Sequence, residues 1–592
     1  MHGYDGIDPT RISDELGGEE GFRLLAAEAA AHGLGIVLDV VPNHLAASDE
    51  NELWRDPKER ARVFDVDPVS GRHRRFADID ELAGVRVEDP DVFALTQGLV
   101  VRLVQEELAD GLRVDHPDGL ADPRGYLERL RGCGIERVWV EKILEPGEHL
   151  RGWPTVGTTG YEFLNQAQLL FVDPAGERPL TELAAESRPW EEVAFEARME
   201  QATTTFVAEI ERLRRLLDVP DLALAVASLP VYRTYVEPWS GRVDEADRVA
   251  LAGLPAELRR VMLLEERGHD EFVTRFQQTS GPVMAKGVED TAFYRYVRLL
   301  ALNEVGGDPG RFSLSVEEFH AANAERAAHL PLSLLAGTTH DTKRSADVRA
   351  RIGALAGIAE RFAEAALGWQ RLAAPLRVGD GPDWNEELFL YQTLLGTWPI
   401  ELDRLQPHLV KALREAKRHT SWGHPDEAYE RDVVGFAAAL CADAAFRAGF
   451  DPFAAEVAAR GESAALGQLV LRFTVPGVPD IYNGDELPYL ALVDPDNRRP
   501  VDWAARRGAL ARGDVTKLNT IRALLALRSR RPWCFEHAYE PLDAPPDTCA
   551  FLRGDDVLVA VNVRGGPAEV VGPSGTWTPV VDLPGAVVYE RA

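Results

Sequence analysis

The chain has 592 residues, of which 45% are apolar and 27% charged, and its formal net charge is −31. This composition is typical of a soluble globular protein, and a chain of this length should fold into about two to four domains. The negative charge argues against nucleic acid and anionic membrane surfaces as partners, because both bind clustered positive charge. The first residues are neither basic nor apolar, and no stretch approaches the roughly 18 consecutive apolar residues of a membrane helix. We therefore expect a cytoplasmic protein.

Four cysteines are scattered along the chain: Cys133, Cys441, Cys534 and Cys549. None has the close Cys/His spacing of a zinc site, so we expect reduced thiols, no metal and no other cofactor. Cys534 and Cys549 could face each other in a C-terminal β-domain.

The first helix-and-strand unit covers residues 19–44. Apolar residues recur at helical spacing over 19–32, and Gly33 is suited to end that helix. The almost wholly apolar run 35–41 predicts a strand covered on both faces, and polar side chains follow it at 42–44. This succession is typical of an α/β barrel.

The same unit then recurs. A predicted helix over 91–109 leads into a strand over 111–114 that ends at Asp115. Arg113 lies two residues before Asp115, on the same face of the strand, and can hold that acid ionised. A purely structural Arg–Asp ion pair is the alternative that this stretch alone leaves open.

A second carboxylate follows the next strand. A short helix over 126–130 precedes a strand over 137–140, which ends at Glu141. In a barrel the carboxyl ends of the strands share one face, where barrel enzymes keep their active sites. A third carboxylate, Asp341, follows the apolar run 332–335.

The rest of the chain completes a four-part division. We expect residues 1–160 to form the first part of the barrel, with a short loop domain at about 45–90, and residues 161–330 to be a largely helical insertion. Part of that insertion could instead supply a barrel strand and helix. Residues 331–535 would complete the barrel, and the short β segments of 536–592 predict an antiparallel β-sandwich.

Three acids at strand ends on one face favour chemistry on glycosidic bonds. Retaining enzymes of this kind use one carboxylate as nucleophile and a second carboxyl group as acid and base. Four segments resemble the four ordered sequence regions of the α-amylase superfamily (glycoside hydrolase family 13 type): residues 39–44, 111–116, 138–142 and 339–341.

Further segments narrow the resemblance to the maltooligosyl trehalose synthase family. They are residues 2–5, 15–18, 116–123, 157–161, 286–296, 340–345 and 492–500. The resemblance implies an isomerase, a glucosylmutase that rearranges the reducing-end α-1,4 bond of a maltooligosaccharide to an α,α-1,1 bond.

The resemblance also implies roles for individual residues. Asp115 would be the nucleophile, Glu141 the general acid and then base, and Asp341 the transition-state stabiliser. The expected substrate-binding residues are Arg113, which would orient Asp115, the histidines His44, His116 and His340, the sugar platform Tyr4, and Lys286, Glu289 and Lys343 at the reducing-end glucose. Each histidine could instead anchor a loop, Tyr4 could pack a loop, and the last three residues could form a salt-bridged loop.

The family's first sequence region follows the third strand of its barrel, yet only 38 residues precede Asp39. We therefore expect a (β/α)8 TIM-type barrel that lacks its first two strands, with a gap before the third. An α-amylase-type hydrolase and an inactive glucan-binding homologue remain as alternatives. The resemblance implies a maltooligosaccharide substrate and a maltooligosyl trehalose trehalohydrolase acting next, and we expect a monomer.

Overall fold

The computed structural model describes residues 3–186, 188–536 and 539–592. The chain divides into two compact units, the first made of residues 1–159 and 195–288 and the second of residues 160–194 and 289–592. These units cut across the predicted four-part division, because the range 161–330 contributes to both.

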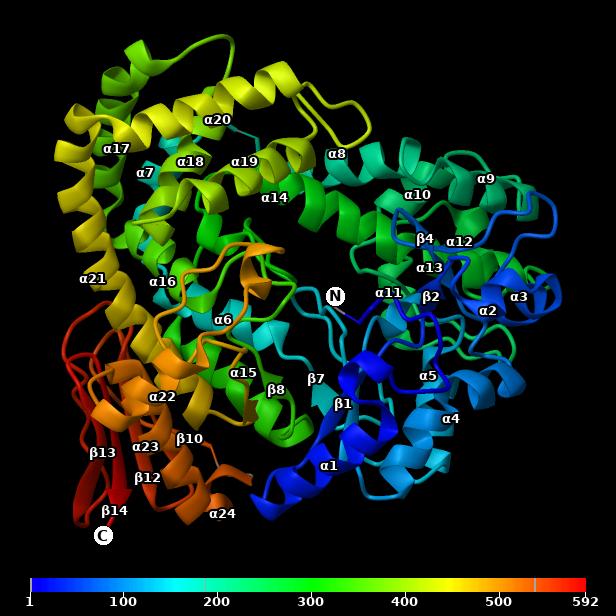
Figure 1. Ribbon diagram of the computed structural model, residues 1–592, viewed down its shortest axis with the longest axis horizontal. Coiled ribbons are helices and arrows are strands. Elements are labelled where there is room, and N and C mark those ends of the chain that lie inside the picture. The colour runs from blue at the N-terminus through cyan, green and yellow to red at the C-terminus, as the bar shows by residue number, and fades with distance from the viewer. Residues whose placement is uncertain (1–2, 187, 537–538) are drawn as a thin grey trace. The chain divides into compact units, whose positions relative to one another are not determined.

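The first unit is built on a four-stranded parallel sheet with the order β1-β5-β6-β7, and Figure 1 labels its outer strands β1 and β7. Its strands are β1 (Val37–Val40), β5 (Gly111–Val114), β6 (Val138–Val140) and β7 (Gly157–Thr158). The helices α1 (Gly18–Ala31), α4 (Pro90–Gln105) and α5 (Pro123–Gly132) alternate with them along the chain. The predicted helices and strands of this region are confirmed to within a few residues.

The expectation that the run 35–41 is covered on both faces is wrong at its start. Val37 is 47% exposed, and the side chain of Asp39 is also exposed. Among the described residues β1 pairs only with β5, so it lies at the edge of its sheet. An apolar edge strand can keep side chains exposed to solvent, because no neighbouring strand lies on its other side.

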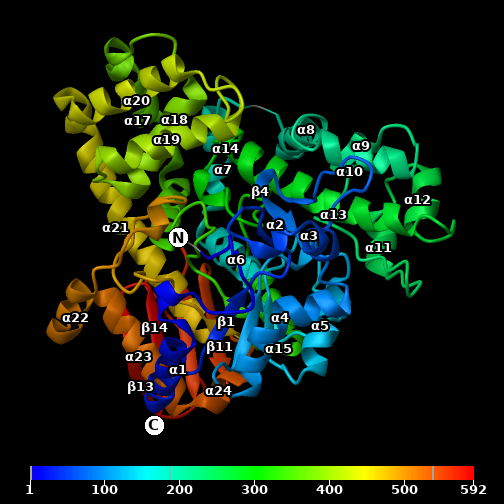
Figure 2. The same ribbon diagram turned by 45° about the vertical axis from the view of Figure 1, so that its right-hand side comes forward.

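The predicted loop domain at about 45–90 contains a small antiparallel sheet with the order β2-β4-β3. Its elements are β2 (His44–Ala46), α2 (Glu52–Arg55), α3 (Pro57–Val63), β3 (Arg75–Phe76) and β4 (Ile79–Gly84). The first unit also contains a group of helices with its own apolar core (Figure 2). These are α9 (Val207–Leu216), α10 (Leu222–Ala227), α11 (Glu245–Ala250), α12 (Ala256–Met262) and α13 (Asp270–Gly287).

The second unit is mainly helical. Its helices are α6 (Tyr161–Phe171), α7 (Glu177–Leu183), α14 (Phe293–Arg295), α15 (Val316–His329), α16 (Ala346–Gly353), α17 (Ala359–Ala373), α18 (Trp384–Thr397), α19 (Leu402–Ala416), α20 (Glu427–Ala442), α21 (Ala444–Thr474), α22 (Trp503–Arg512), α23 (Thr516–Arg530) and α24 (Pro532–Glu536), while α8 (Trp190–Thr203) runs from this unit into the first. Two strands, β8 (Leu334–Leu335) and β9 (Val478–Pro479), pair in parallel. The helical character predicted for 161–330 is confirmed, since its described residues contain helices and no strand.

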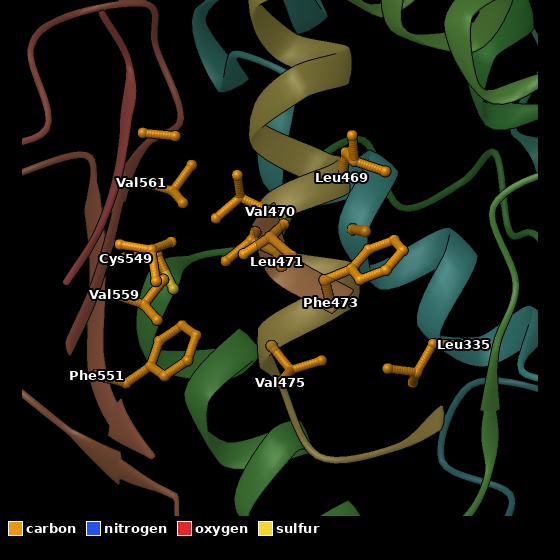
Figure 3. Packing of buried hydrophobic residues seen from close by; sticks show 14 of the residues in the cluster. Leu335, Leu469, Val470, Leu471, Phe473, Val475, Cys549, Phe551, Val559 and Val561 are labelled. Carbon is orange, nitrogen blue, oxygen red and sulfur yellow. The ribbon is translucent and has the colours of Figure 1, made fainter. Parts of the chain in front are cut away.

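The antiparallel strands predicted for the C-terminal domain are confirmed, but among the described residues they do not form a sandwich. The described residues form one five-stranded antiparallel sheet with the order β10-β11-β12-β14-β13. Its strands are β10 (Glu540–Pro541), β11 (Thr548–Arg553), β12 (Val557–Asn562), β13 (Trp577–Leu583) and β14 (Ala586–Arg591). Figure 3 shows Phe551 and Val559 of this sheet in the same core as Leu471 and Val475 at the end of α21. A helix therefore covers the face for which a second sheet was expected.

All four cysteines are free thiols, as predicted. Cys534 and Cys549 are buried. Cys441 is partly buried, and this raises the pKa of its thiol to about 11. Among the described residues no single helix combines the length and apolar composition needed to cross a membrane, and only the bent pair α20 and α21 meets both measures when taken together.

Candidate active site

The centre of the candidate site is Arg113, a buried residue of β5. Its Nη1 atom donates to Asp115 Oδ1 at 2.7 Å and to Asp39 Oδ1 at 2.8 Å, and its Nη2 atom lies 3.2 Å from Glu141 Oε1. The predicted Arg113–Asp115 pair is confirmed, and the same guanidinium holds two further carboxylates. Because a guanidinium is a planar fork with fixed donor directions, it sets the relative positions of the acids it binds.

The parallel sheet explains why these groups meet. Asp39 in β1 is the register partner of Arg113 in β5, and β6 pairs on the other side of β5. Asp115 and Glu141 each follow directly after their strand, so both leave the sheet at its carboxyl edge. The side chains of Asp115 and Glu141 are only 9% and 15% exposed, so water screens their interaction with Arg113 only in part.

A second contact joins the two strand-end loops. The backbone N–H of His116 donates to Glu141 Oε2 at 3.0 Å. His116 has φ +43°, a left-handed conformation that is uncommon for a residue with a side chain, and this turns the backbone toward Glu141. Burial lowers the pKa of the His116 imidazole, which is therefore neutral near pH 7.

Tyr4 is linked to this cluster through Asp39, and His44 is linked to Tyr4. The Tyr4 hydroxyl donates to Asp39 Oδ2 at 2.6 Å, and burial followed by the charge of Asp39 raises the pKa of the phenol. His44 Nε2 lies 3.0 Å from the Tyr4 carbonyl oxygen, which can only accept, so that nitrogen carries the proton. The other ring nitrogen of His44 lies 3.3 Å from Asn43 Nδ2. These contacts match the loop-anchoring alternative for His44.

One aromatic residue of the site was not predicted. Phe76, at the end of β3, stacks on the ring of His44 with centroids 4.3 Å apart and meets the ring of His116 edge-on at 5.2 Å. Nothing in the sequence around Phe76 distinguishes it from a core residue. The contacts of Asp39 with Arg113 and Tyr4 were also not predicted.

The second unit holds the third predicted acid, Asp341, in the loop after β8. His340 Nε2 lies 3.0 Å from Asp341 Oδ2, and the Asp341 backbone N–H donates to Thr339 Oγ1 at 3.1 Å. Asn497 Nδ2 donates to the His340 carbonyl at 2.8 Å. The side chain of Asp341 is 39% exposed, much more than that of Asp115.

Lys343 lies two residues further on. With Glu289 and Asp290 it forms a group of charged side chains, the second unit's cluster. Its Nζ atom lies 2.9 Å from Asp290 Oδ1 and 4.0 Å from Glu289 Oε2. Burial opposes the charge of this ammonium, but Asp290 and its neighbours outweigh burial and raise the pKa of Lys343 well above its ordinary value. Glu289 and Asp290 lie in a π-helical turn over 288–292, a type of irregularity that is frequent at functional sites.

Each predicted site residue has a defined place. The first unit brings together Tyr4, His44, Arg113, Asp115, His116 and Glu141, whereas Glu289, His340, Asp341 and Lys343 belong to the second unit. Lys286, in α13 of the first unit, lies 3.1 Å from Asp78 Oδ1. The ion pairs of Lys286 and Lys343 match the salt-bridged alternative, and Asp290 is a partner that was not predicted.

Asp115 and Glu141, which follow neighbouring parallel strands, are the kind of carboxyl pair that enzymes use for a double displacement at a sugar carbon. The site therefore defines a class, the enzymes that break and form glycosidic bonds.

Comparison with known proteins identifies the family. No protein-family model matches the chain. A putative maltooligosyl trehalose synthase of Mycobacterium tuberculosis is 36% identical over 98% of this chain and 89% of its own length. The solved maltooligosyltrehalose synthase of Arthrobacter ramosus superposes with a TM-score of 0.90 at 34% identity, covering 100% of this chain and 94% of that one. A hypothetical maltooligosyl trehalose synthase of Sulfolobus tokodaii gives a TM-score of 0.89 at 30% identity, with the same coverage. The chain belongs to the maltooligosyl trehalose synthase family.

Proposed function

We propose that Asp115 and Glu141 carry out the reaction of this family in this chain: intramolecular transglucosylation that turns the reducing-end α-1,4 bond of a maltooligosaccharide into an α,α-1,1 bond. The enzyme is an isomerase, since substrate and product have the same composition. The observation that carries the assignment is the single guanidinium of Arg113 between the two carboxylates.

In the first displacement, a carboxylate oxygen of Asp115 attacks C1 of the penultimate glucosyl unit. The bond from C1 to the leaving oxygen breaks, and Glu141 gives its proton to that oxygen. Arg113 keeps Asp115 ionised and aimed, because a nearby cation favours the charged form of an acid. Asp341 would stabilise the positive charge that develops on the sugar.

In the second displacement, the freed glucose attacks the same carbon with its own anomeric hydroxyl. Glu141 now accepts the proton of that hydroxyl, the bond to Asp115 breaks, and the 1,1 linkage forms. The glucose must stay bound and turn, and holding it raises its effective concentration far above that of a free acceptor. Lys286, Glu289 and Lys343 are our candidates for holding it, and exclusion of water keeps hydrolysis from competing.

This mechanism requires Asp341 to face the Asp115–Glu141 pair. We infer a (β/α) barrel of the family's type for this chain, in which Asp341 follows β8 as Asp115 and Glu141 follow β5 and β6. Family membership and the carboxylates that follow β5, β6 and β8 support this inference.

The decisive experiment incubates the purified chain with maltopentaose and follows reducing ends and free glucose in parallel. We expect reducing ends to fall without matching glucose release, because the 1,1 linkage leaves no free anomeric carbon. A rise in reducing ends would mean that water is the acceptor and that the chain is an α-1,4-glucan hydrolase. No change in either quantity, with bound maltopentaose, would identify a glucan-binding protein.

The product would end in a trehalose unit attached by an ordinary α-1,4 bond. A maltooligosyl trehalose trehalohydrolase is therefore the partner reaction that we propose, and adding such an enzyme to the reaction should release free trehalose. We propose that the monomer is active, which sedimentation of the active enzyme would test.

A further inference from the structure

Lys142 follows Glu141 directly, yet its side chain lies among different groups. The side chain is 1% exposed, and its Nζ atom lies 3.4 Å from Asp118 Oδ2 and 3.3 Å from Glu148 Oε1. The same ammonium donates to the backbone carbonyl of Ile143. A buried ammonium loses its hydration, so an ion pair of this kind is weak support for stability and calls for another explanation.

Asp118 is itself held in place. It lies in the short turn Pro117–Gly119, three residues after Asp115, and is 5% exposed. The Tyr235 hydroxyl donates to its carboxylate, and Arg233 Nη1 donates to its backbone carbonyl at 2.7 Å. Asp118 can therefore act as a fixed point for Lys142.

The loop around Asp118 is closely packed. A Cβ atom on Gly119 would lie 2.3 Å from Asn43 Oδ1, so a larger side chain there would have to displace Asn43. Gln278 Nε2 donates to the Gly119 carbonyl at 2.9 Å. The turn is thus fixed by contacts that do not involve Lys142.

Two links consequently join the loop that carries Asp115 to the loop that carries Glu141. One is the hydrogen bond from His116 N–H to Glu141 Oε2, at 3.0 Å, and the other is the buried Lys142–Asp118 pair. A displacement of the loop after β6 would have to break both.

We propose that Lys142 is a positioning residue, which acts through Asp118 to hold Glu141 where it can protonate the leaving oxygen. This inference rests on the proposed function, in which Glu141 is the general acid. It assigns to Lys142 no contact with the substrate.

The test compares two substrates that differ in their need for an acid. With maltopentaose, the bond from C1 to the leaving oxygen breaks, the bond from C1 to Asp115 forms, and the oxygen takes a proton from Glu141. With α-maltosyl fluoride, the C1–F bond breaks as the same bond to Asp115 forms, and fluoride leaves with the bonding electrons and needs no proton. The ratio of kcat/KM for the two substrates therefore reports how well the acid is placed, and general acids typically contribute about 10² to 10⁴-fold.

For Lys142→Met we expect kcat/KM on maltopentaose to fall about 10²-fold, while kcat/KM on α-maltosyl fluoride changes less than about threefold. Asp118→Asn, which keeps the size of the side chain and an acceptor for Tyr235, should shift the ratio in the same direction. If Lys142→Met does not fold, the Asp118→Asn variant tests whether the Lys142–Asp118 pair positions Glu141.

The matched control is Arg124→Met, which removes the cation of another pair of the first unit. Arg124 Nε donates to Glu237 Oε1 at 2.9 Å, and its side chain is 15% exposed. This variant should leave the ratio unchanged. Equal losses on both substrates, or no loss in a folded Lys142→Met or Asp118→Asn variant, would overturn the proposal.

The ratio is measured on bond cleavage, whichever acceptor follows. If the wild-type chain releases glucose instead of forming 1,1 bonds, the proposed function fails while the role of Lys142 can still be read from the ratio. A wild-type chain that cleaves neither substrate would overturn both proposals.

Discussion

The Arg113 cluster of the first unit and the Lys343 cluster of the second hold their charged groups in different ways. In the first unit, one cation, Arg113, serves three carboxylates, and the side chains of Asp115 and Glu141 are almost fully covered. In the second unit, the ammonium of Lys343 lies between two carboxylates of a π-helical turn, and Asp341 is more than one-third exposed. One arrangement fixes acids by a rigid fork, whereas the other uses a point charge with rotatable donors.

This contrast fits the two halves of the proposed reaction. Forming and breaking a bond to Asp115 requires carboxylates that keep one geometry, which a planar guanidinium supplies. Holding a glucose that must turn before it attacks requires donors that can follow it.

Asp115→Asn should lower the rate of 1,1-bond formation by at least about 10⁴-fold, because removing a covalent nucleophile removes the reaction path. The amide oxygen can still accept from Arg113, so the melting temperature should change by only a few degrees. The measurement is the rate of loss of reducing ends from maltopentaose. Glu141→Gln is the matched comparison, since it should still react with α-maltosyl fluoride, and rapid turnover of Asp115→Asn would contradict the assignment.

Arg113→Met should lower kcat about 10² to 10³-fold and reduce the free energy of unfolding by about 3–5 kcal/mol, because it leaves buried carboxylates without their cation. Rate measurements and urea unfolding check the two effects. Arg113→Lys keeps the charge but cannot bridge Asp115 and Glu141 as a fork, so it should recover more of the stability than of the rate. Full recovery of both the rate and the stability in Arg113→Lys would show that the positive charge alone, and not the shape of the guanidinium, is what the site needs.

Lys343→Met should change the outcome of the second displacement more than the rate of the first. We expect about tenfold more glucose per 1,1 bond formed, because a loosely held acceptor lets water compete. Asp290→Asn, which weakens the anchor of the same ammonium, should give a smaller shift in the same direction. An unchanged ratio of glucose to 1,1 product in both variants would mean that Lys343 and Asp290 do not hold the acceptor glucose.

Much of this contrast could be predicted from the sequence, for identifiable reasons. Short apolar runs that end in Pro, Gly or charged residues predicted the strands before Asp115, Glu141 and Asp341. The two-residue spacing predicted the Arg113–Asp115 pair. The roles of these residues came from the resemblance to a family, because a strand-end carboxylate has no fixed function by itself.

Other features depend on contacts between distant residues. Asp39 and Arg113 are 74 positions apart and meet only because β1 and β5 pair in register. Phe76 reaches the histidines through the small β2-β4-β3 sheet, which no short motif marks. The C-terminal β segments were predicted from short runs separated by Gly and Pro. Such runs do not say whether a second sheet or a helix covers the apolar face, and here α21 covers it.

The smallest expected effect is on the stability of the second unit, at a residue that has no role in the proposed reaction. His408 is 6% exposed, stacks on Phe389, and neither ring nitrogen has a hydrogen-bond partner among the described residues. Burial lowers the pKa of His408 to about 3, so the imidazole stays neutral in the fold but gains a proton below about pH 6.5 once the chain unfolds. Stability should therefore fall as the pH drops from 6.5 toward 3, by up to about 1.4 kcal/mol per pH unit from this group.

His408→Phe removes that titration, so urea unfolding of the variant between pH 7 and pH 4.5 should lose stability less steeply than the wild type, by about 1 kcal/mol per pH unit. Its kcat at pH 7 should match the wild type, because His408 has no place in the proposed mechanism. His424→Phe is the control: His424 is exposed, so the slope should stay that of the wild type. If the pH dependence of stability in His408→Phe equals that of the wild type, the folded chain binds a proton at His408 as easily as the unfolded chain does. The buried face of α19 would then accommodate an imidazolium.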